Sequence, residues 1–307
     1  MQNNKIFITG ISGFLGSQIA KQFLNKGQKI IATKRSKSNL WRCEEFIDDI
    51  IWINTDERDW GTKIIDLKPE IIIHSAWSGV SANDRDDWEV QLSNIDFTLT
   101  ILQVAQKCEV KKFIGFGSQA EYGNFSGIID ENYLLKPNSA YASSKIAVSQ
   151  IINDFCSINN INWYWFRLFS FFGELESNNW FIPTLIDKIL NEQKMDMTPG
   201  EQKYAYMYVE DLANLIKKIV HSNVKPGIYN ISSSNAISLV EIANKILALI
   251  KPKTSKIHFG AIPYRENQSM HIQGSTLKIE RELGEKIEES DFNNSLSKVV
   301  KYKINKY

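Results

Sequence analysis

Three side chains with the chemistry needed at a carbonyl group lie in the middle of the chain. Ser118 follows an apolar run, and Tyr141 and Lys145 stand four residues apart in a segment of helical pattern. That spacing places the last two on one face of a helix, one turn apart. The phenol of a free tyrosine titrates near about 10, and a neighbouring ammonium lowers that pKa by stabilising the phenolate. We therefore expect Tyr141 to donate a proton to a carbonyl oxygen that Ser118 orients, as hydride reaches the carbon.

The tyrosine–lysine spacing is not specific by itself, because Tyr302 and Lys306 repeat it near the C-terminus. The first pair differs in two ways. Ser118 precedes Tyr141 by 23 residues, and a glycine-rich turn lies near the N-terminus. Together these features favour a catalytic interpretation over a structural one. For Glu121, close to the serine, a structural or orienting role is as open as a chemical one.

The glycine-rich turn is typical of a dinucleotide-binding site. Gly10, Gly13 and Gly16 lie between a strand-like segment and a helix with one apolar face. The first glycine permits a tight turn, the second lets the backbone approach a pyrophosphate, and the third lets helix and strand pack closely. The unpaired N–H groups and partial positive charge of the helix N-terminus then favour phosphate binding.

The end of the second predicted strand indicates which cofactor is bound. An NAD site commonly has a carboxylate here, which accepts a hydrogen bond from the ribose 2′-hydroxyl. This strand ends instead in Thr33, Lys34, Arg35 and Ser36. Cations and hydroxyls suit a 2′-phosphate, which arginine binds in a bidentate manner. We therefore predict NADP (NADPH) as the cofactor, with a solvated basic loop end as the alternative interpretation.

Short apolar runs alternate with helical patterns along most of the chain. Such runs are typical of parallel strands buried on both faces, and their alternation with helices indicates right-handed βαβ units. The predicted fold class is α/β, a Rossmann doubly wound parallel sheet with a smaller C-terminal substrate-binding lobe. The predicted strands are 5–9, 29–33, 50–53, 71–74, 113–116, 162–167 and 228–231.

The domain organisation follows from where this alternation is interrupted. We expect residues 1–170 and 204–235 to form the cofactor-binding domain. Residues 171–203 and 236–307 hold Pro, Gly and loop-like stretches between short helices. They are expected to form the lobe at the C-terminal end of the sheet, where such folds bind substrates.

The composition narrows the class of protein. Lys and Arg total 36 against 35 Asp and Glu, so no global field favours nucleic acid or an anionic membrane. Cys43, Cys108 and Cys156 lack metal-ligand or disulfide spacing and indicate reduced thiols in a reducing compartment. The N-terminus has no leader pattern, and no run approaches the ~18 apolar residues of a membrane span. We expect a cytoplasmic protein without a metal site.

The chain resembles the extended short-chain dehydrogenases/reductases, and within them the nucleotide-sugar epimerase, dehydratase and reductase branch. The resemblance covers nearly the whole length and rests on the glycine turn, Ser118, the Tyr141–Lys145 pair and Asn94. The segment 167–173 resembles the substrate loop of the family. The segments 200–211 and 259–265 are most similar to CDP-paratose and CDP-abequose synthases, which reduce the 4-keto group of a CDP-linked 4-keto-6-deoxyhexose.

The resemblance implies a nucleotide-diphosphate-sugar substrate, a homodimer, and a set of site residues. Ser118, Tyr141 and Lys145 would be catalytic, and Lys145 would also hold the nicotinamide ribose. The expected cofactor-binding residues are Gly10, Ser12, Gly13, Phe14, Leu15, Gly16, Lys34, Arg35, Ala76, Tyr141 and Lys145. The expected substrate-binding residues are Trp77, Gln119, Ala120, Ser170, Trp180 and Arg265.

Departures from the family pattern reduce the number of reactions that the chain is expected to catalyse. Sugar 4,6-dehydratases carry Asp-Glu where this chain has Gln119 and Ala120, neither of which can act as a general acid or base. Epimerase-reductases similar to GDP-fucose synthase need a cysteine at Ala120 and a histidine near 177–180, and both are missing. Tyr204 stands where relatives often carry a phosphate-binding arginine, and Ser170 replaces a common asparagine. Dehydration and added epimerisation are therefore disfavoured.

The predicted function is an NADPH-dependent reductase of the C4 keto group of a nucleotide-linked 4-keto-6-deoxy sugar, in surface-polysaccharide sugar biosynthesis. The alternative is a nucleotide-sugar C4 epimerase with a retained NAD, against which the basic residues Lys34 and Arg35 argue. A third hypothesis is a non-catalytic cofactor-binding protein. The intact Ser118, Tyr141 and Lys145 argue against it.

Overall fold

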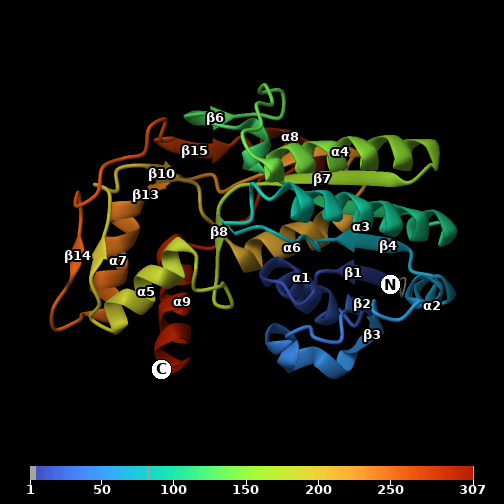
Figure 1. Ribbon diagram of the computed structural model, residues 1–307, viewed down its shortest axis with the longest axis horizontal. Helices are drawn as coiled ribbons and strands as arrows, with labels where there is room; N and C mark the ends of the chain where they lie inside the picture. Colours follow the sequence, from blue (N-terminus) through green and yellow to red (C-terminus); the bar gives the residue numbers. More distant parts are fainter. Residues whose placement is uncertain (1–4, 82, 307) are drawn as a thin grey trace.

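The computed structural model describes residues 5–81 and 83–306, and a seven-stranded parallel sheet forms its centre (Figure 1). Its strands are β1 (Ile6–Thr9), β2 (Ile30–Lys34), β3 (Ile50–Asn54), β4 (Ile71–His74), β5 (Lys112–Ser118), β7 (Asn162–Leu168) and β12 (Gly227–Ile231). Their order is β12-β7-β5-β4-β1-β2-β3, and each neighbouring pair is parallel. The strand order reverses between β1 and β4, as in a doubly wound sheet. The predicted fold class is confirmed.

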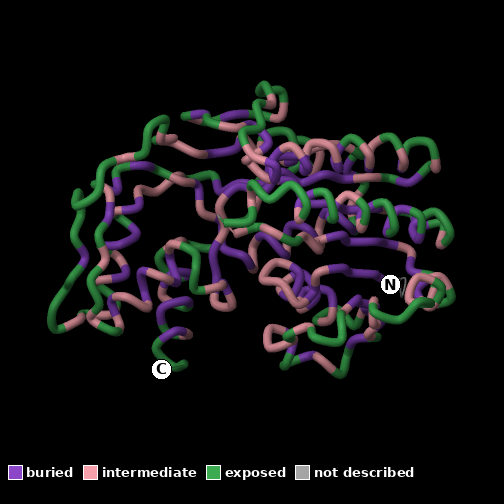
Figure 2. Tube along the Cα trace, in the orientation of Figure 1, coloured by how far each residue is buried: buried purple, intermediate pink, exposed green. Residues whose placement is uncertain are grey.

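Helices cover both faces of this sheet, which is why its strands are largely apolar. The helices are α1 (Phe14–Leu24), α2 (Trp60–Leu67), α3 (Trp88–Lys107), α4 (Ala140–Ile158), α6 (Val209–Val220) and α8 (Leu277–Leu283). Ile6 and Ile8 pack on the face covered by α1, α6 and α8, and Phe7 packs on the face covered by α2, α3 and α4. The trace is correspondingly buried along the sheet (Figure 2).

Two short 3₁₀ helices complete this part of the chain. They are η1 (Trp41–Asp49), which leads into β3, and η2 (Gln119–Tyr122), which directly follows β5. Because β5 ends at Ser118, η2 starts at the carboxyl edge of the sheet. This is the edge at which open parallel sheets bind their ligands.

A second part of the chain has its own core, formed by α5 (Phe181–Leu190), α7 (Leu239–Ile250) and α9 (Phe292–Lys306). It lies beyond the carboxyl edge of the large sheet (Figure 1). A four-stranded sheet runs beside it in the order β13-β10-β15-β6. These strands are β6 (Gly127–Ile129), β10 (Lys203–Tyr204), β13 (Ile237–Ser238) and β15 (His271–Gly274). Two further pairs are β8 (Phe171–Phe172) with β11 (Met207–Tyr208) and β9 (Met195–Asp196) with β14 (Ile257–His258).

Each of the two parts includes a short element from a chain segment that otherwise belongs to the other part. β6, from the first half of the chain, pairs with β15, whereas α8 packs against the core of the large sheet through Ile279. The division into domains at residues 170, 204 and 236 stays a prediction. Within residues 5–81 and 83–306, no helix is long and apolar enough to cross a lipid bilayer.

Candidate active site

Ser118 lies where β5 ends and η2 begins. Its backbone N–H donates to Glu121 Oε1 at 2.9 Å, and its Oγ accepts from the Ala120 N–H at 3.2 Å. A serine at the cap and a glutamate three residues later satisfy each other's backbone donors in this reciprocal way. The serine side chain is thus fixed at the carboxyl end of a central strand.

Tyr141 lies in the first turn of α4, which Ser139 caps by accepting a hydrogen bond from the Ala142 N–H at 3.1 Å. Tyr141 is 7% exposed, and its hydroxyl lies near that of Ser118. Burial raises the pKa of Tyr141, while the Ser118 hydroxyl and the charge of Arg85 act in the opposite direction. The structure therefore brings together the serine and the tyrosine that the sequence pointed to.

Lys145 is buried one turn further along α4. Its Nζ donates to the carbonyl oxygen of Phe116 at 2.7 Å and lies 3.4 Å from the centre of the Trp77 ring. Burial lowers the pKa of Lys145 to about 7, and the carboxylate of Glu121 acts against that shift. The ammonium group lies 5.7 Å from the centre of the Tyr141 ring. It thus faces the backbone and an indole more closely than it faces the phenol.

Arg85 is a residue of this region that sequence reasoning missed. Its guanidinium carbon lies 5.0 Å from the centre of the Tyr141 ring, and its backbone carbonyl accepts a hydrogen bond from the Tyr141 N–H at 2.8 Å. The sequence-based expectation gave Lys145 the role of lowering the pKa of Tyr141, whereas Arg85 is the cation with that effect here. No spacing rule connects a loop at residue 85 with a helix that starts at residue 140, so only the fold reveals this contact.

The turn between β1 and α1 has a shape that fits a dinucleotide. Gly10 has φ of 71°, and a Cβ there would lie 2.5 Å from the backbone nitrogen of Ala76. A Cβ on Gly16 would collide with the carbonyl oxygen of Gly10. No side chain in the described parts of the sequence caps α1, whose N-cap is Gly13. Its first-turn N–H groups are therefore available to a phosphate.

The other residues expected at the cofactor surround this turn. The Phe14 ring stacks on Phe171 with 5.7 Å between centres, and the carbonyl oxygen of Ser12 accepts from Arg42 Nη1 at 3.3 Å. Leu15 packs against the core of the sheet. The turn is thus tied both to Phe171 of β8 and to the segment after β2.

The basic end of β2 lies next to an acidic group. Lys34 Nζ lies 5.7 Å from the centre of the Trp52 ring, and Arg35 is exposed. The Ser36 N–H donates to the carboxylate of Asp56 at 2.8 Å, and this bond holds the pKa of Asp56 below its ordinary value. Two cations and one carboxylate therefore lie near the end of β2, the end at which such folds contact the adenosine ribose of a dinucleotide.

Three of the residues expected at the substrate lie beside Ser118 and Tyr141. The Trp77 ring meets the Tyr141 ring edge to face, with 6.1 Å between centres. Ala120 donates its N–H to Ser118, as described above. Gln119 Oε1 is buried and finds no hydrogen-bond partner among residues 5–81 and 83–306. A buried acceptor without a partner is unfavourable unless a ligand or water supplies a donor.

Two polar side chains hold the end of β4 and the segment that follows it. Asn94 accepts from the Ser78 N–H at 2.7 Å and donates to the Ser78 carbonyl at 3.0 Å. His74 lies between the hydroxyls of Thr9 and Thr98 at 2.8 and 2.9 Å. Burial lowers the pKa of His74 to about 3, so it is a neutral part of the core rather than a catalytic base.

Most of the chain matches one known protein family. Residues 6–232, which include the glycine turn, Ser118, Tyr141 and Lys145, match the NAD dependent epimerase/dehydratase family. The chain belongs to this family. Its members are extended short-chain dehydrogenases/reductases, so the resemblance seen in the sequence is confirmed.

Two curated proteins match most of the chain. The dTDP-6-deoxy-L-talose 4-dehydrogenase (NAD(+)) of Aggregatibacter actinomycetemcomitans is 28% identical over 286 residues, which cover 88% of this chain and 99% of the relative. The CDP-abequose synthase of Salmonella muenchen is 26% identical over 280 residues, covering 89% and 90%. Both are named for a reaction on a nucleotide-linked sugar.

Solved structures share the fold of this chain. The UDP-N-acetylglucosamine 4-epimerase of Methanobrevibacter ruminantium superposes with a TM-score of 0.88 at 20% identity, covering all of both chains. The dTDP-glucose 4,6-dehydratase of Streptomyces venezuelae, solved with NAD bound, superposes with a TM-score of 0.84 at 20% identity, covering 98% and 97%. At these identities the superpositions establish the architecture.

The remaining substrate-binding residues expected of a family member lie in other elements. Ser170 precedes β8, and its carbonyl oxygen accepts from the Met207 N–H at 2.9 Å. Trp180 is the N-cap of α5 and is 40% exposed. Arg265 is exposed, and its charge lowers the pKa of Tyr204, which burial raises overall. Arg265 therefore lies near the position where relatives often carry an arginine.

Proposed function

We propose that this chain is an NADPH-dependent reductase of the C4 keto group of a nucleotide-linked 4-keto-6-deoxy sugar. The observation that carries the proposal is the placement of the Tyr141 hydroxyl near the Ser118 hydroxyl, with the ammonium of Lys145 buried one helical turn away. A hydroxyl pair of this kind can orient a ketone oxygen and protonate it. Gln119 and Ala120, beside it, offer no general acid or base for elimination of water.

Each of the three side chains has a separate task in this proposal. NADPH, when bound, supplies the hydride. Tyr141 donates its phenolic proton to the oxygen at C4, and Ser118 orients that oxygen through its hydroxyl. Lys145 holds the nicotinamide ribose and keeps positive charge near the phenol. Trp77 covers Lys145 and so keeps water from the ammonium group.

The proposed cofactor site uses the turn at Gly10, Gly13 and Gly16, with Ser12, Phe14, Leu15 and Ala76 around it. Lys34 and Arg35 are assigned to a 2′-phosphate, because both are cations at the end of β2. Asp56 and the NAD named for the talose dehydrogenase support NADH as the alternative. Relative affinity for the two cofactors decides between them.

The proposed substrate class rests on the relatives and on the position of the second core. Oxidation at C4 of a 6-deoxy sugar, for which the Aggregatibacter enzyme is named, is the reverse of the reduction proposed here. The nucleotide diphosphate is assigned to the lobe of residues 171–203 and 236–307, with Arg265 as its cation. Trp77, Gln119, Ala120, Ser170 and Trp180 are assigned to the sugar.

A homodimer is proposed through α3 and α4. On α3, Trp88, Leu92 and Leu99 are exposed large apolar side chains at spacings of a single helical stripe. Asn94 belongs to this helix and Tyr141 to the neighbouring one. Light scattering on the purified protein would give twice the mass of the chain if the stripe is an interface. A location in the cytoplasm stays a prediction.

Turnover tests this function. Purified protein is mixed with NADPH and with 4-keto-6-deoxy sugars linked to CDP, dTDP, GDP or UDP, after a thermal-shift screen of the four nucleotides. We expect one sugar to oxidise NADPH, and Tyr141→Phe to lower the rate by about 10²–10⁴-fold with NADPH still bound. Tyr302→Phe is the control and retains full activity. Interconversion of 4-hydroxy sugars without added cofactor would identify a C4 epimerase instead.

A further inference from the structure

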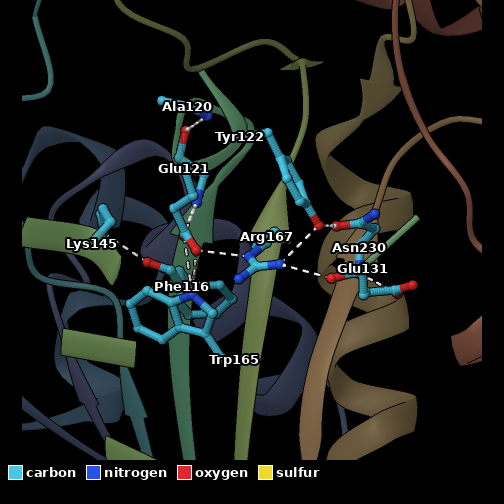
Figure 3. A network of polar contacts seen from close by, with 10 residues as sticks. Phe116, Ala120, Glu121, Tyr122, Glu131, Lys145, Trp165, Arg167 and Asn230 are labelled. Atoms are coloured by element: carbon cyan, nitrogen blue, oxygen red, sulfur yellow. Dashed lines mark hydrogen bonds and ion pairs between the residues drawn. The ribbon is translucent and has the colours of Figure 1, made fainter. Parts of the chain in front are cut away.

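A buried ion pair lies next to the backbone N–H of Ser118. Arg167 Nε, from β7, lies 2.7 Å from Glu121 Oε2, and the two side chains are 3% and 0% exposed. Figure 3 shows the pair between the ends of β5 and β7, with Lys145 on one side and Tyr122 and Asn230 on the other. Both charges are therefore withdrawn from water at the carboxyl edge of the sheet.

The carboxylate of Glu121 is fully occupied by donors. Its Oε1 accepts from the Ser118 N–H at 2.9 Å and from Trp165 Nε1 at 3.1 Å, while Oε2 accepts from Arg167. A Cβ on Gly117 would collide with Oε1, so glycine is needed there for the carboxylate to approach the strand. The same carboxylate thus neutralises part of the arginine's charge through Oε2 and fixes the backbone of Ser118 through Oε1.

The guanidinium of Arg167 is held from the far side. Its Nη1 donates to the Tyr122 hydroxyl at 3.0 Å and to the Glu131 carbonyl at 3.4 Å. The Tyr122 hydroxyl in turn donates to Asn230 Oδ1 at 2.7 Å. This chain of contacts, drawn in Figure 3, gives both charged groups several partners with defined directions.

Fold stability alone is a poor explanation for such a pair. Withdrawing two charges from water costs several kcal/mol per ion, and apolar residues of similar size often stabilise a fold as well or better. This pair also sits where it acts on two proposed catalytic groups. Glu121 bonds to the backbone of Ser118, and its charge raises the pKa of Lys145 against the effect of burial.

We propose that Glu121 and Arg167 are a positioning pair, in which Glu121 fixes Ser118 and the balance of the two charges controls whether Lys145 carries its proton. The inference rests on the proposed roles of Ser118 and Lys145. Neither member of the pair touches the reacting atoms in this scheme. Each acts through a neighbour.

The charged and titratable groups around Lys145 determine in which direction each substitution shifts its pKa. Glu121 of η2 is its anion, with Arg167 of β7 beyond it. Tyr141 lies on the same helix with Arg85 over its ring, and His74 at the end of β4 also feels the charge of Lys145. The rings of Trp77 and Trp165, which do not titrate, fill the remaining space at 3.4 and 5.7 Å.

Substitutions of Glu121 and of Arg167 are expected to shift the pKa of Lys145 in opposite directions. Removing the negative charge with Glu121→Gln leaves Arg167 uncompensated and lowers the pKa of Lys145. Removing the positive charge with Arg167→Met leaves Glu121 uncompensated and raises it. A pair with only a structural role would give unstable variants whose Lys145 titrates as in the wild-type protein.

The test is a titration of Lys145 by NMR in protein labelled with carbon-13 lysine, with its signal assigned by Lys145→Arg. We expect shifts of about one unit or more downward in Glu121→Gln and upward in Arg167→Met. The double variant returns toward the wild-type value. Shifts in one direction for both variants, or none, would overturn the proposal.

Matched variants keep the test decisive. Glu131→Gln removes a carboxylate of the same network that accepts from the Asn230 N–H, and is expected to leave Lys145 unchanged. If Glu121→Gln does not fold, as judged by circular dichroism, Arg167→Lys and Arg167→Met decide. Arg167→Lys keeps the positive charge and is expected to leave the pKa of Lys145 near the wild-type value. Arg167→Met removes the charge and is expected to raise the pKa of Lys145. Equal titrations in these two would contradict the proposal.

The NMR readout needs no substrate, which separates this inference from the proposed function. If the two variants shift the pKa of Lys145 in opposite directions but the protein reduces no keto sugar, the positioning pair is supported and the reductase function is rejected. If the wild-type protein reduces a keto sugar but the variants leave the pKa of Lys145 unshifted, the reductase function is supported and the positioning pair is rejected. Where turnover is found, the basic limb of kcat/KM for reduction moves to lower pH in Glu121→Gln and to higher pH in Arg167→Met, because reduction needs protonated Lys145 and Tyr141.

Discussion

The guanidinium of Arg85 lies over the ring of Tyr141, 5.0 Å from its centre, and the backbones of the two residues are joined by a hydrogen bond of 2.8 Å. The bond ties the loop after β4 to the first turn of α4. A cation at this position favours the phenolate and so makes the phenol a stronger acid. Tyr141 is buried, which has the opposite effect on its pKa, and Arg85 therefore offsets part of that burial.

Arg85→Gln tests this contact. Loss of the charge raises the pKa of Tyr141, so proton donation weakens and kcat/KM for reduction falls by roughly ten-fold for each unit. The titration of Tyr141, followed by NMR in protein labelled with carbon-13 tyrosine, moves to higher pH, because the phenol keeps its proton longer. Arg281→Gln, at an exposed arginine on α8, is the control in which this titration is unchanged. A slower enzyme in which Tyr141 titrates as in the wild-type protein would show that Arg85 acts by other means.

His74 gives the protein an acid-sensitive core. Its pKa falls from an ordinary 6.5 to about 3 because it is buried, so the folded state binds fewer protons than the unfolded state between these values. Stability contributed by neutral His74 is complete above about pH 6.5 and is lost as the pH falls toward 3, at about 1.4 kcal/mol per unit.

Urea unfolding of wild type and His74→Gln across this range measures the effect. The difference in unfolding free energy between the two proteins should shrink as the pH falls, because glutamine has no proton to gain. His258→Gln, at an exposed histidine, serves as the control and should run parallel to wild type. A constant difference between wild type and His74→Gln would mean that His74 is not held neutral.

Cofactor choice is predicted to depend on Arg35. If the exposed guanidinium binds a 2′-phosphate, Arg35→Ala weakens NADPH binding by about 10–100-fold, the value of one or two charge-assisted hydrogen bonds. NADH binding stays unchanged, since NADH lacks that phosphate. Fluorescence titration of both cofactors provides the two constants, with Lys37→Ala as a neighbouring control. Tighter binding of NADH than NADPH by the wild-type protein would reject the NADP assignment.

The strands and the main reacting groups were accessible from the sequence for a physical reason. Parallel strands covered on both faces leave continuous apolar runs, and each of the seven predicted runs is a strand of the large sheet. A spacing of four on a helix fixes Tyr141 and Lys145 on one face. Ser118 follows an apolar run and therefore falls at a strand end.

Contacts between distant elements were not accessible in this way. Glu121 and Arg167 are separated by 46 residues, and only the pairing of β5 with β7 brings them together. The sequence-based prediction assumed that the ammonium of Lys145 points toward the phenol of Tyr141. In the fold, the carbonyl of Phe116 and the ring of Trp77 compete for that ammonium. Such competition depends on packing, for which the sequence carries no local signal.

Transfer of a labelled hydride tests the central claim most directly. NADPH carrying deuterium at its transferable position is mixed with the purified protein and the 4-keto-6-deoxy nucleotide sugar that passes the screen, and the product is examined by NMR and mass spectrometry. Our account predicts one deuterium at C4 of the sugar for each NADPH oxidised, and none with Tyr141→Phe. A product formed without consumption of NADPH and without deuterium at C4 would contradict it.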